Sequence, residues 1–195
     1  MKQKIEQYLS QFKTVTLIGP MTENPQTPSE SGILYIDGGA KYKRESGFSI
    51  GDNDSFDGGL DLVLPPVKNY SDLAFALSLI PETVQEVVLI GFLGGRKDHE
   101  LINYGEAYHF LETRSQTKIF FDSNMLGFSK GQWSISLAGT FSILSFKDQN
   151  ISLGGACKYP LENQKLKAYS SHGLSNEASG IISLDLELPA LVFKN

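Results

Sequence analysis

Five short apolar runs lie in the first two thirds of the chain, each flanked by polar or glycine-rich sequence. Their ranges are 14–19, 33–36, 61–64, 86–91 and 118–121. Continuous apolar runs of this length are typical of strands that are buried on both faces, as in a parallel sheet. The pattern therefore predicts a parallel β-sheet in this part of the chain.

Two segments between these runs have helical features. The first is 71–80, where Ser71 can cap the start of a helix and Pro81 lies just beyond its end. The second is 98–112. Five of its residues fall on one stripe at helical spacing: Leu101, Tyr104, Gly105, Tyr108 and Leu111. Strands that alternate with helices predict an α/β domain with crossover connections.

The pattern changes after about residue 122. Short alternating runs follow one another, separated by glycine, asparagine, aspartate and lysine. Five or more short strands at this spacing predict a small antiparallel β-sandwich. We therefore expect an α/β fold in two domains: a parallel-sheet α/β domain at 1–123 and a C-terminal antiparallel β-sandwich at 124–195.

Composition narrows the class of protein. The chain has 195 residues, a net charge of -5 and no lysine- or arginine-rich run, so we expect no nucleic-acid partner. No apolar run approaches the roughly 20 residues that a membrane span needs, and the N-terminal segment lacks the apolar core of a secretion signal. The single cysteine, Cys157, excludes an intramolecular disulfide. These features predict a cytoplasmic protein with no membrane partner.

Negative charge is concentrated in the segment SIGDNDSFDGG at 49–59. In an extended segment Asp52 and Asp54 point to the same side, so their carboxylates can converge on one cation. Mg²⁺ takes one or two protein carboxylates and fills its octahedron with water and phosphate oxygens. A calcium loop of the EF-hand type is excluded, because its twelfth position would be Val63 instead of glutamate. A solvated Asx-turn is the alternative.

A second candidate site is the junction between the fourth predicted strand and the second predicted helix. Gly94 and Gly95 would let backbone N–H groups and the helix N-terminus face an anion, and Arg96 adds a forked donor suited to phosphate. The patterns G-x-G-x-x-G and G-x-x-x-x-G-K-[ST] are absent, which disfavours the usual dinucleotide and P-loop sites. Asp98 could instead be a plain helix-start residue, and His99 a surface or capping residue.

Two more polar segments could bind a ligand. In KNYSD at 68–72, Lys68 could reach phosphate and Asp72 could supply a metal carboxylate, although an acid at a helix start is also favoured by the helix dipole. In SSHGLSNE at 170–177, hydroxyls and an amide could orient a polar heterocycle or form a solvent-facing turn. The three histidines and the cysteine lack zinc-ligand spacing, and no G-x-S-x-G elbow occurs.

Six short motifs follow one another along the chain in a characteristic order. They are DGGA (37–40), GDNDS (51–55), KNYSD (68–72), GGRKDHELIN (94–103), KYPL (158–161) and SNE (175–177). In this order they resemble the thiamine pyrophosphokinase family, and the pair GD-x-DS and GGR-x-DH is the specific part. The matches extend from about residue 33 to 178, which is most of the chain.

The resemblance implies an α/β domain that binds ATP, a β-sandwich that binds thiamine, and a homodimer with thiamine held between subunits. The implied reaction moves a diphosphoryl group from ATP to the thiamine hydroxyl with Mg²⁺ as cofactor, and it releases AMP. The implied metal ligands are Asp52, Asp54 and Asp72. The implied nucleotide-binding residues are Asp37, Gly38, Gly39, Lys68, Gly94, Gly95 and Arg96. The implied thiamine contacts are Asp98, Ser175 and Asn176, and the implied catalytic residues are Asp52, Asp54, Asp72 and Asp98.

Three departures from the family pattern bear on activity. Asn69 stands where the family usually has an acid, which removes a charge but keeps an oxygen ligand. Only 15 positions separate Asp37 from Asp52, which leaves little room for the helix expected there. The segment 20–31 has the composition of a Pro/Ser-rich loop, where the family normally has a helix. Two alternatives follow: a related pyrophosphokinase for another heterocyclic alcohol, or a non-catalytic regulatory paralogue that binds thiamine or nucleotide.

Overall fold

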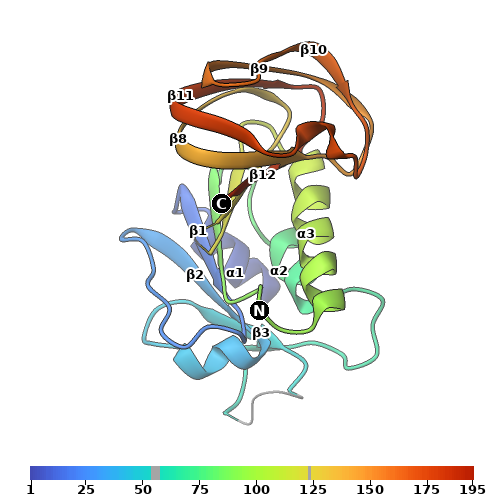
Figure 1. Cartoon of the computed structure of the whole chain (residues 1–195). Coiled ribbons are helices and arrows are strands. Elements are labelled where there is room, and N and C mark those ends of the chain that lie inside the picture. Colours follow the sequence, from blue (N-terminus) through green and yellow to red (C-terminus); the bar gives the residue numbers. More distant parts are fainter. Residues whose placement is uncertain (54–57, 123) are drawn as a thin grey trace. The chain divides into compact units, whose positions relative to one another are not determined.

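The computed structural model of the chain describes residues 1–53, 58–122 and 124–195 (Figure 1). The backbone forms two compact units. The first unit comprises Met1–Ala107 and Ile119–Asp122, and the second comprises Tyr108–Lys118 and Ser123–Asn195. The chain thus has a mixed α/β fold, and no described helix is long and apolar enough to cross a bilayer.

The first unit is built on a parallel sheet. Its strands are β1 (Thr14–Ile18), β2 (Ser31–Ile36), β3 (Phe48–Gly51), β4 (Leu62–Val63), β5 (Glu86–Ile90) and β6 (Lys118–Phe121). Their order in the sheet is β6-β5-β1-β2-β3-β4. Strand β1 pairs in parallel with β2 and β5, and β3 pairs in parallel with β2 and β4. All five predicted strands are confirmed, and β3 is an additional strand that the pattern of apolar residues did not indicate.

Burial follows the position of each strand in this sheet. Val15 and Leu17 of the central strand β1 are fully buried. The expectation of burial on both faces is wrong for β4, where Val63 is 53% exposed. The reason is that β4 stands at the end of the strand order and, among the described strands, pairs only with β3.

The helices of the first unit also follow the sequence signals. They are α1 (Lys2–Leu9), α2 (Asp72–Ser78) and the first part of α3 (Lys97–Glu112). Helix α2 is capped as predicted, since the Ser71 Oγ accepts a hydrogen bond from the Ala74 N–H at 3.0 Å. The predicted apolar stripe on α3 is wrong at Leu101, which is 56% exposed, whereas Tyr108 and Leu111 are buried. Helical spacing places a residue on a face but does not fix how far neighbours cover that face.

The connections on either side of β2 contain no α-helix. The segment before β2 has no helix between residues 19 and 30, as its composition predicted. After β2 the chain forms a short 3₁₀ helix, η1 (Asp37–Tyr42), in place of a longer α-helix. Helix η1 begins directly at the end of β2, so it holds Asp37 at that end of the sheet.

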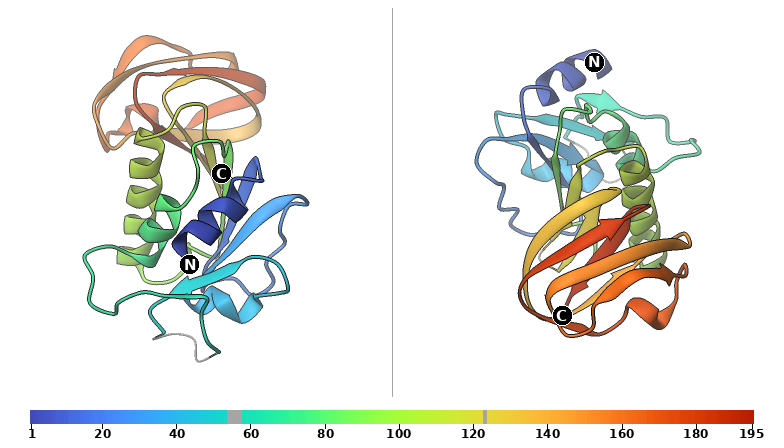
Figure 2. Two further views of the ribbon diagram at one scale, coloured as in Figure 1. Left: turned by 180° about the vertical axis from the view of Figure 1, so that it is seen from behind. Right: turned by 90° about the horizontal axis from the view of Figure 1, so that it is seen from above.

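The second unit is antiparallel. Its elements are β7 (Met125–Phe128), β8 (Gly131–Leu144), β9 (Gln149–Cys157), β10 (Leu161–Leu166), the 3₁₀ helix η2 (Ser171–Gly173), β11 (Asn176–Leu186), β12 (Ala190–Lys194) and the end of α3. Their strand order is β10-β9-β11-β8-β12-β7. The long strand β8 pairs with β11 along most of its length and with β12 at its end, and both β8 and β11 curve (Figure 2).

The predicted antiparallel pairing is confirmed by these registers. Burial along β11 alternates as expected for a sheet with one covered face: Ile182, Leu184 and Leu186 are buried, and the residues between them are exposed. The packing of these strands as two layers of a sandwich stays a prediction.

Replacing Ser71 with alanine is expected to lower the free energy of unfolding by about 1 kcal/mol, because the Ala74 N–H loses its cap. Urea titration followed by circular dichroism measures the change. Ser78→Ala is the matched control, since the exposed Ser78 Oγ donates to the Phe75 carbonyl at the other end of α2 and caps no N–H at the helix start. The control should change stability by less than about 0.5 kcal/mol, and equal losses in both variants would contradict the capping role.

Candidate functional site

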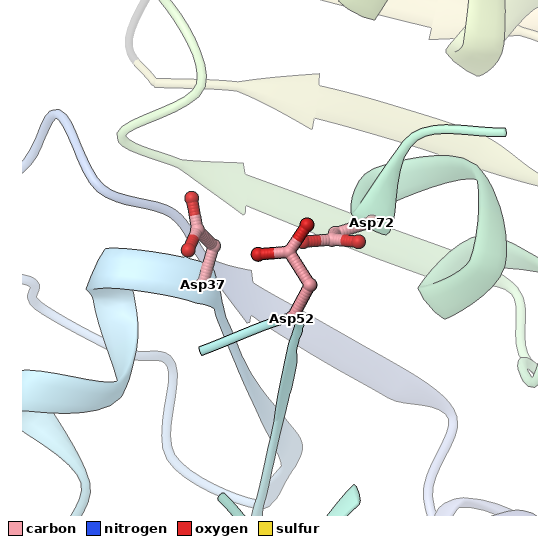
Figure 3. A group of neighbouring side chains, drawn as sticks. All are labelled: Asp37, Asp52 and Asp72. Atoms are coloured by element: carbon pink, nitrogen blue, oxygen red, sulfur yellow. The ribbon is translucent and has the colours of Figure 1, made fainter. Parts of the chain in front are cut away.

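Three aspartates from separate segments meet in the first unit (Figure 3). Asp37 follows β2, Asp52 follows β3, and Asp72 begins α2. Each offers one carboxylate oxygen, and these three oxygens lie within 4.8 Å of one another. Because β2 and β3 are parallel neighbours, the carboxyl ends of both strands lie at one edge of the sheet, which brings Asp37 and Asp52 together.

The backbone of Asp37 is unusual. Its φ is 52°, in the left-handed region that few residues other than glycine adopt and that aspartate tolerates better than most. Residues held in such a conformation cluster at ligand sites, where the surrounding structure maintains the strain. The sharp change of direction at Asp37 follows from the step directly from β2 into η1.

Lys68 lies between two of the three carboxylates. Its Nζ is 2.8 Å from Asp52 Oδ2 and 3.0 Å from Asp72 Oδ1, and its side chain is only 9% exposed. Burial lowers the pKa of Lys68, but the hydrogen bonds to Asp52 and Asp72 outweigh burial and hold that pKa above its ordinary value. The Lys68 side chain therefore stays protonated and places a positive charge inside the group of aspartates.

The aspartates face a cleft, here called the aspartate cleft, that consists of two adjoining hollows. The first has a volume of about 270 Å³ and is lined by Asp37, Asp52, Lys68 and Asp72 among others. The second has a volume of about 280 Å³. Both hollows are lined by Pro20, Asp37, Phe92, His99 and Asn103. Because they share these residues, the two hollows can hold different parts of one extended ligand.

The donor set suits a divalent cation. Carboxylate oxygens are the ligands that Mg²⁺ prefers, and Mg²⁺ completes its coordination with water and phosphate oxygens, for which the neighbouring cleft has room. Three carboxylates and the Lys68 ammonium together carry a formal charge of −2, which a divalent cation would neutralise. Asp37, Asp52 and Asp72 are therefore the described residues that fit a metal site.

The glycine-containing junction before α3 lines the second hollow through Gly95 and Arg96. The backbone N–H of Gly94 donates to Glu100 Oε2 at 3.3 Å, so it serves the start of α3. Arg96 pairs with Asp98, and the two side chains are 71% and 62% exposed. The hydrogen bond from Arg96 holds the pKa of Asp98 below its ordinary value.

The structure thus brings only some of the sequence-predicted residues together. Asp37, Asp52, Lys68 and Asp72 come together, whereas Asp98 does not line either hollow of the aspartate cleft. Asp54 lies outside the described residues. The assigned roles of all these residues stay predictions.

Gly38 and Gly39 are buried in η1. A Cβ atom on Gly39 would lie 2.1 Å from the carbonyl oxygen of Ile18, at the end of β1. Packing of the backbone alone therefore requires glycine at position 39. This requirement is independent of a contact with nucleotide.

Ser175 and Asn176 lie in the second unit and line a hollow of about 190 Å³ together with Tyr159 and His172. The Asn176 side chain is tied to the backbone: its Oδ1 accepts from Tyr159 N at 3.1 Å, and its Nδ2 donates to Tyr159 O at 2.7 Å. Asn176 thus holds the segment after β9 against the start of β11. That contact connects the sequence motifs KYPL and SNE.

Sequence reasoning missed four residues that line both hollows: Pro20, Phe92, His99 and Asn103. Asn103 donates from Nδ2 to the Phe92 carbonyl at 2.7 Å, which fixes the wall of the cleft. His99 and Asn103 are four residues apart at the start of α3, so they share one face of the helix. That spacing, directly after a glycine-containing junction, is the signal that could have indicated them.

Comparison with known proteins adds evidence about the fold. No family model and no curated protein matches the sequence. Thiamine pyrophosphokinase from Bacillus subtilis is 21% identical with a TM-score of 0.72, over 94% of this chain and 99% of that one. Thiamin pyrophosphokinase from Geobacillus thermodenitrificans is 19% identical with a TM-score of 0.73, over 93% and 97%. The enzyme from Candida albicans is 16% identical with a TM-score of 0.68, over 94% and 89%.

These solved structures span nearly the whole chain, at low sequence identity. The similarity therefore concerns the arrangement of the helices and strands. The chain has the fold of the thiamin pyrophosphokinases, which confirms at the level of the fold the resemblance that its motifs indicate.

Proposed function

We propose that the chain is a thiamine pyrophosphokinase that transfers a diphosphoryl group from ATP to the hydroxyl of thiamine, with release of AMP. The observation that carries this proposal is the meeting of Asp37, Asp52 and Asp72 beside the aspartate cleft. The similarity of fold to thiamin pyrophosphokinases supports it. Binding at the carboxyl ends of parallel strands is also the common arrangement in open α/β sheets.

Transfer of a phosphoryl-type group depends mainly on in-line positioning and on neutralising charge, and it needs little covalent chemistry from the protein. Asp37, Asp52 and Asp72 would hold Mg²⁺, which supplies Lewis-acid stabilisation of phosphate oxygens when bound. Asp54 would join them by resemblance. The cleft beside these carboxylates would hold the triphosphate in one orientation.

Arg96 would provide a forked donor to phosphate from the wall of the second hollow. Its partner in the structure is Asp98, and an ion pair as exposed as this one contributes little to stability. Arg96 could therefore leave Asp98 and pair with a phosphate group at little cost in free energy. Asp98, once released, would be available to accept the hydroxyl proton of thiamine, a step typically worth about 10²–10⁴-fold in rate.

The acceptor part of the proposal rests on the second unit. Ser175 and Asn176 line a hollow together with Tyr159, and a hollow with hydroxyl, amide and aromatic residues suits a polar heterocycle. By resemblance, the active form would be a homodimer in the cytoplasm, with thiamine bound between subunits. Light scattering at micromolar concentration tests the dimer.

Asn69 bears on the non-catalytic alternative. This residue is exposed and does not line either hollow of the aspartate cleft. The replacement of the family's acid by Asn69 therefore takes no carboxylate from the group of three aspartates. This observation favours the catalytic proposal over a paralogue that only binds its ligands.

Incubation of the pure protein with ATP, Mg²⁺ and thiamine is expected to yield AMP and thiamine diphosphate in equal amounts. Chromatography measures both products. Omitting thiamine, or chelating the metal with EDTA, should abolish both products. Binding of thiamine without turnover would instead support the regulatory alternative. If thiamine is neither bound nor converted, the acceptor would be another heterocyclic alcohol.

A further inference from the structure

Lys68 makes contacts that a divalent cation would also make. Its ammonium group lies within hydrogen-bonding distance of carboxylate oxygens of both Asp52 and Asp72. The side chains of the three residues are 9%, 15% and 14% exposed. Solvent screens such a contact much less than it screens a surface ion pair.

We propose that Lys68 is an internal counter-ion that competes with the divalent cation for Asp52 and Asp72 until the triphosphate of the nucleotide draws it away. The metal and the nucleotide then bind cooperatively. This inference rests on the proposed function, because it requires that the aspartate cleft take a metal–nucleotide complex.

Competition follows from charge and position. An ammonium group and a divalent cation that share the same two carboxylates repel each other across a short distance in a place that is largely removed from water. The ammonium group also occupies one oxygen of each carboxylate. Metal alone must therefore bind either against this repulsion or after Lys68 has lost two buried partners.

A triphosphate removes that cost. Lysine carries its charge on a flexible four-carbon stem and donates in three directions, so it can turn from carboxylate to phosphate without a change in the backbone. Lys68 lines the first hollow, where the phosphates are proposed to bind. Once its charge faces phosphate, Asp52 and Asp72 are free to bind the metal more tightly. Because such coupling is reciprocal, the metal strengthens nucleotide binding by the same factor.

The test measures Mn²⁺ binding to the full chain by electron paramagnetic resonance, without nucleotide and without turnover. Lys68→Met keeps the apolar stem and removes the charge, so its affinity for Mn²⁺ alone is expected to rise by at least about 10-fold. The affinity of the same variant for a non-hydrolysable ATP analogue in EDTA, measured by calorimetry, is expected to fall. Lys68→Gln should behave alike, which covers the case in which one variant folds poorly.

Lys43→Met is the matched control. Lys43 also belongs to the first unit and pairs with an aspartate, Asp61, at 2.7 Å, but it lines neither hollow of the aspartate cleft. Its affinity for Mn²⁺ should equal that of the unmodified chain. Thermal unfolding of each variant verifies that the fold is intact.

Unchanged or weaker Mn²⁺ binding by both Lys68 variants would overturn the inference and leave the proposed function standing, provided that the unmodified chain forms thiamine diphosphate. A chain that binds no Mn²⁺ in any variant, with or without the analogue, would overturn the proposed function and this inference with it. The two failures are therefore distinguishable.

Discussion

Asparagine in place of Asp52 is expected to reduce the rate of thiamine diphosphate formation by at least about 10²-fold. Asp52 is a member of the group of three aspartates and also a partner of Lys68. Asparagine keeps the size and one oxygen of the side chain but removes its charge. The neutralisation of phosphate charge in the transition state then depends on a metal that is bound more weakly.

This variant should stay folded, so loss of activity can be assigned to the site. Thermal unfolding and circular dichroism measure the fold, and initial rates at saturating ATP measure turnover. Asp185→Asn is the matched control: it is the same substitution on an exposed residue of β11 in the second unit, whose carboxylate accepts a hydrogen bond from Gln132 Nε2. Near-normal turnover in Asp52→Asn would remove this residue from the metal site. We expect a similar loss in Asp54→Asn on the basis of the sequence.

Gly39→Ala is expected to lower the free energy of unfolding by about 1–3 kcal/mol, because a Cβ atom at this position would overlap the Ile18 carbonyl oxygen. The overlap involves backbone on both sides. Relief therefore requires η1 to move away from the end of β1, and Asp37 begins η1. A shift of Asp37 would also disturb the group of three aspartates.

Gly95→Ala is the matched control for this prediction. A Cβ atom on Gly95 would lie 2.8 Å from the sulfur of Met21, but methionine is flexible and can change its rotamer. Urea titration of both variants should show a clear loss for Gly39→Ala and a small one for Gly95→Ala. Equal stability of Gly39→Ala and the unmodified chain would show that η1 tolerates a side chain here.

The candidate site could be predicted in part. Asp52 was identified because the acidic segment 49–59 was interpreted as extended, and Asp72 because it stands at the start of a predicted helix, which are local features. Asp37 was assigned to the nucleotide, and its place beside the other two carboxylates depends on the parallel pairing of β2 with β3. His99 was interpreted as a surface or capping residue, and it is indeed exposed, but it also lines both hollows of the aspartate cleft, which a single histidine in the sequence does not indicate.

Local periodicity, capping residues and turn residues determined by themselves that this chain alternates strands and helices before about residue 122 and forms antiparallel strands after it. These features act between residues close in sequence, so they can be followed along the chain. The order of the strands, the exposure of Val63 and Leu101, and the meeting of Lys68 with three carboxylates were decided only by the tertiary structure. The physical reason is that these properties depend on which distant segments pack together, and burial and charge pairing take their values from that packing.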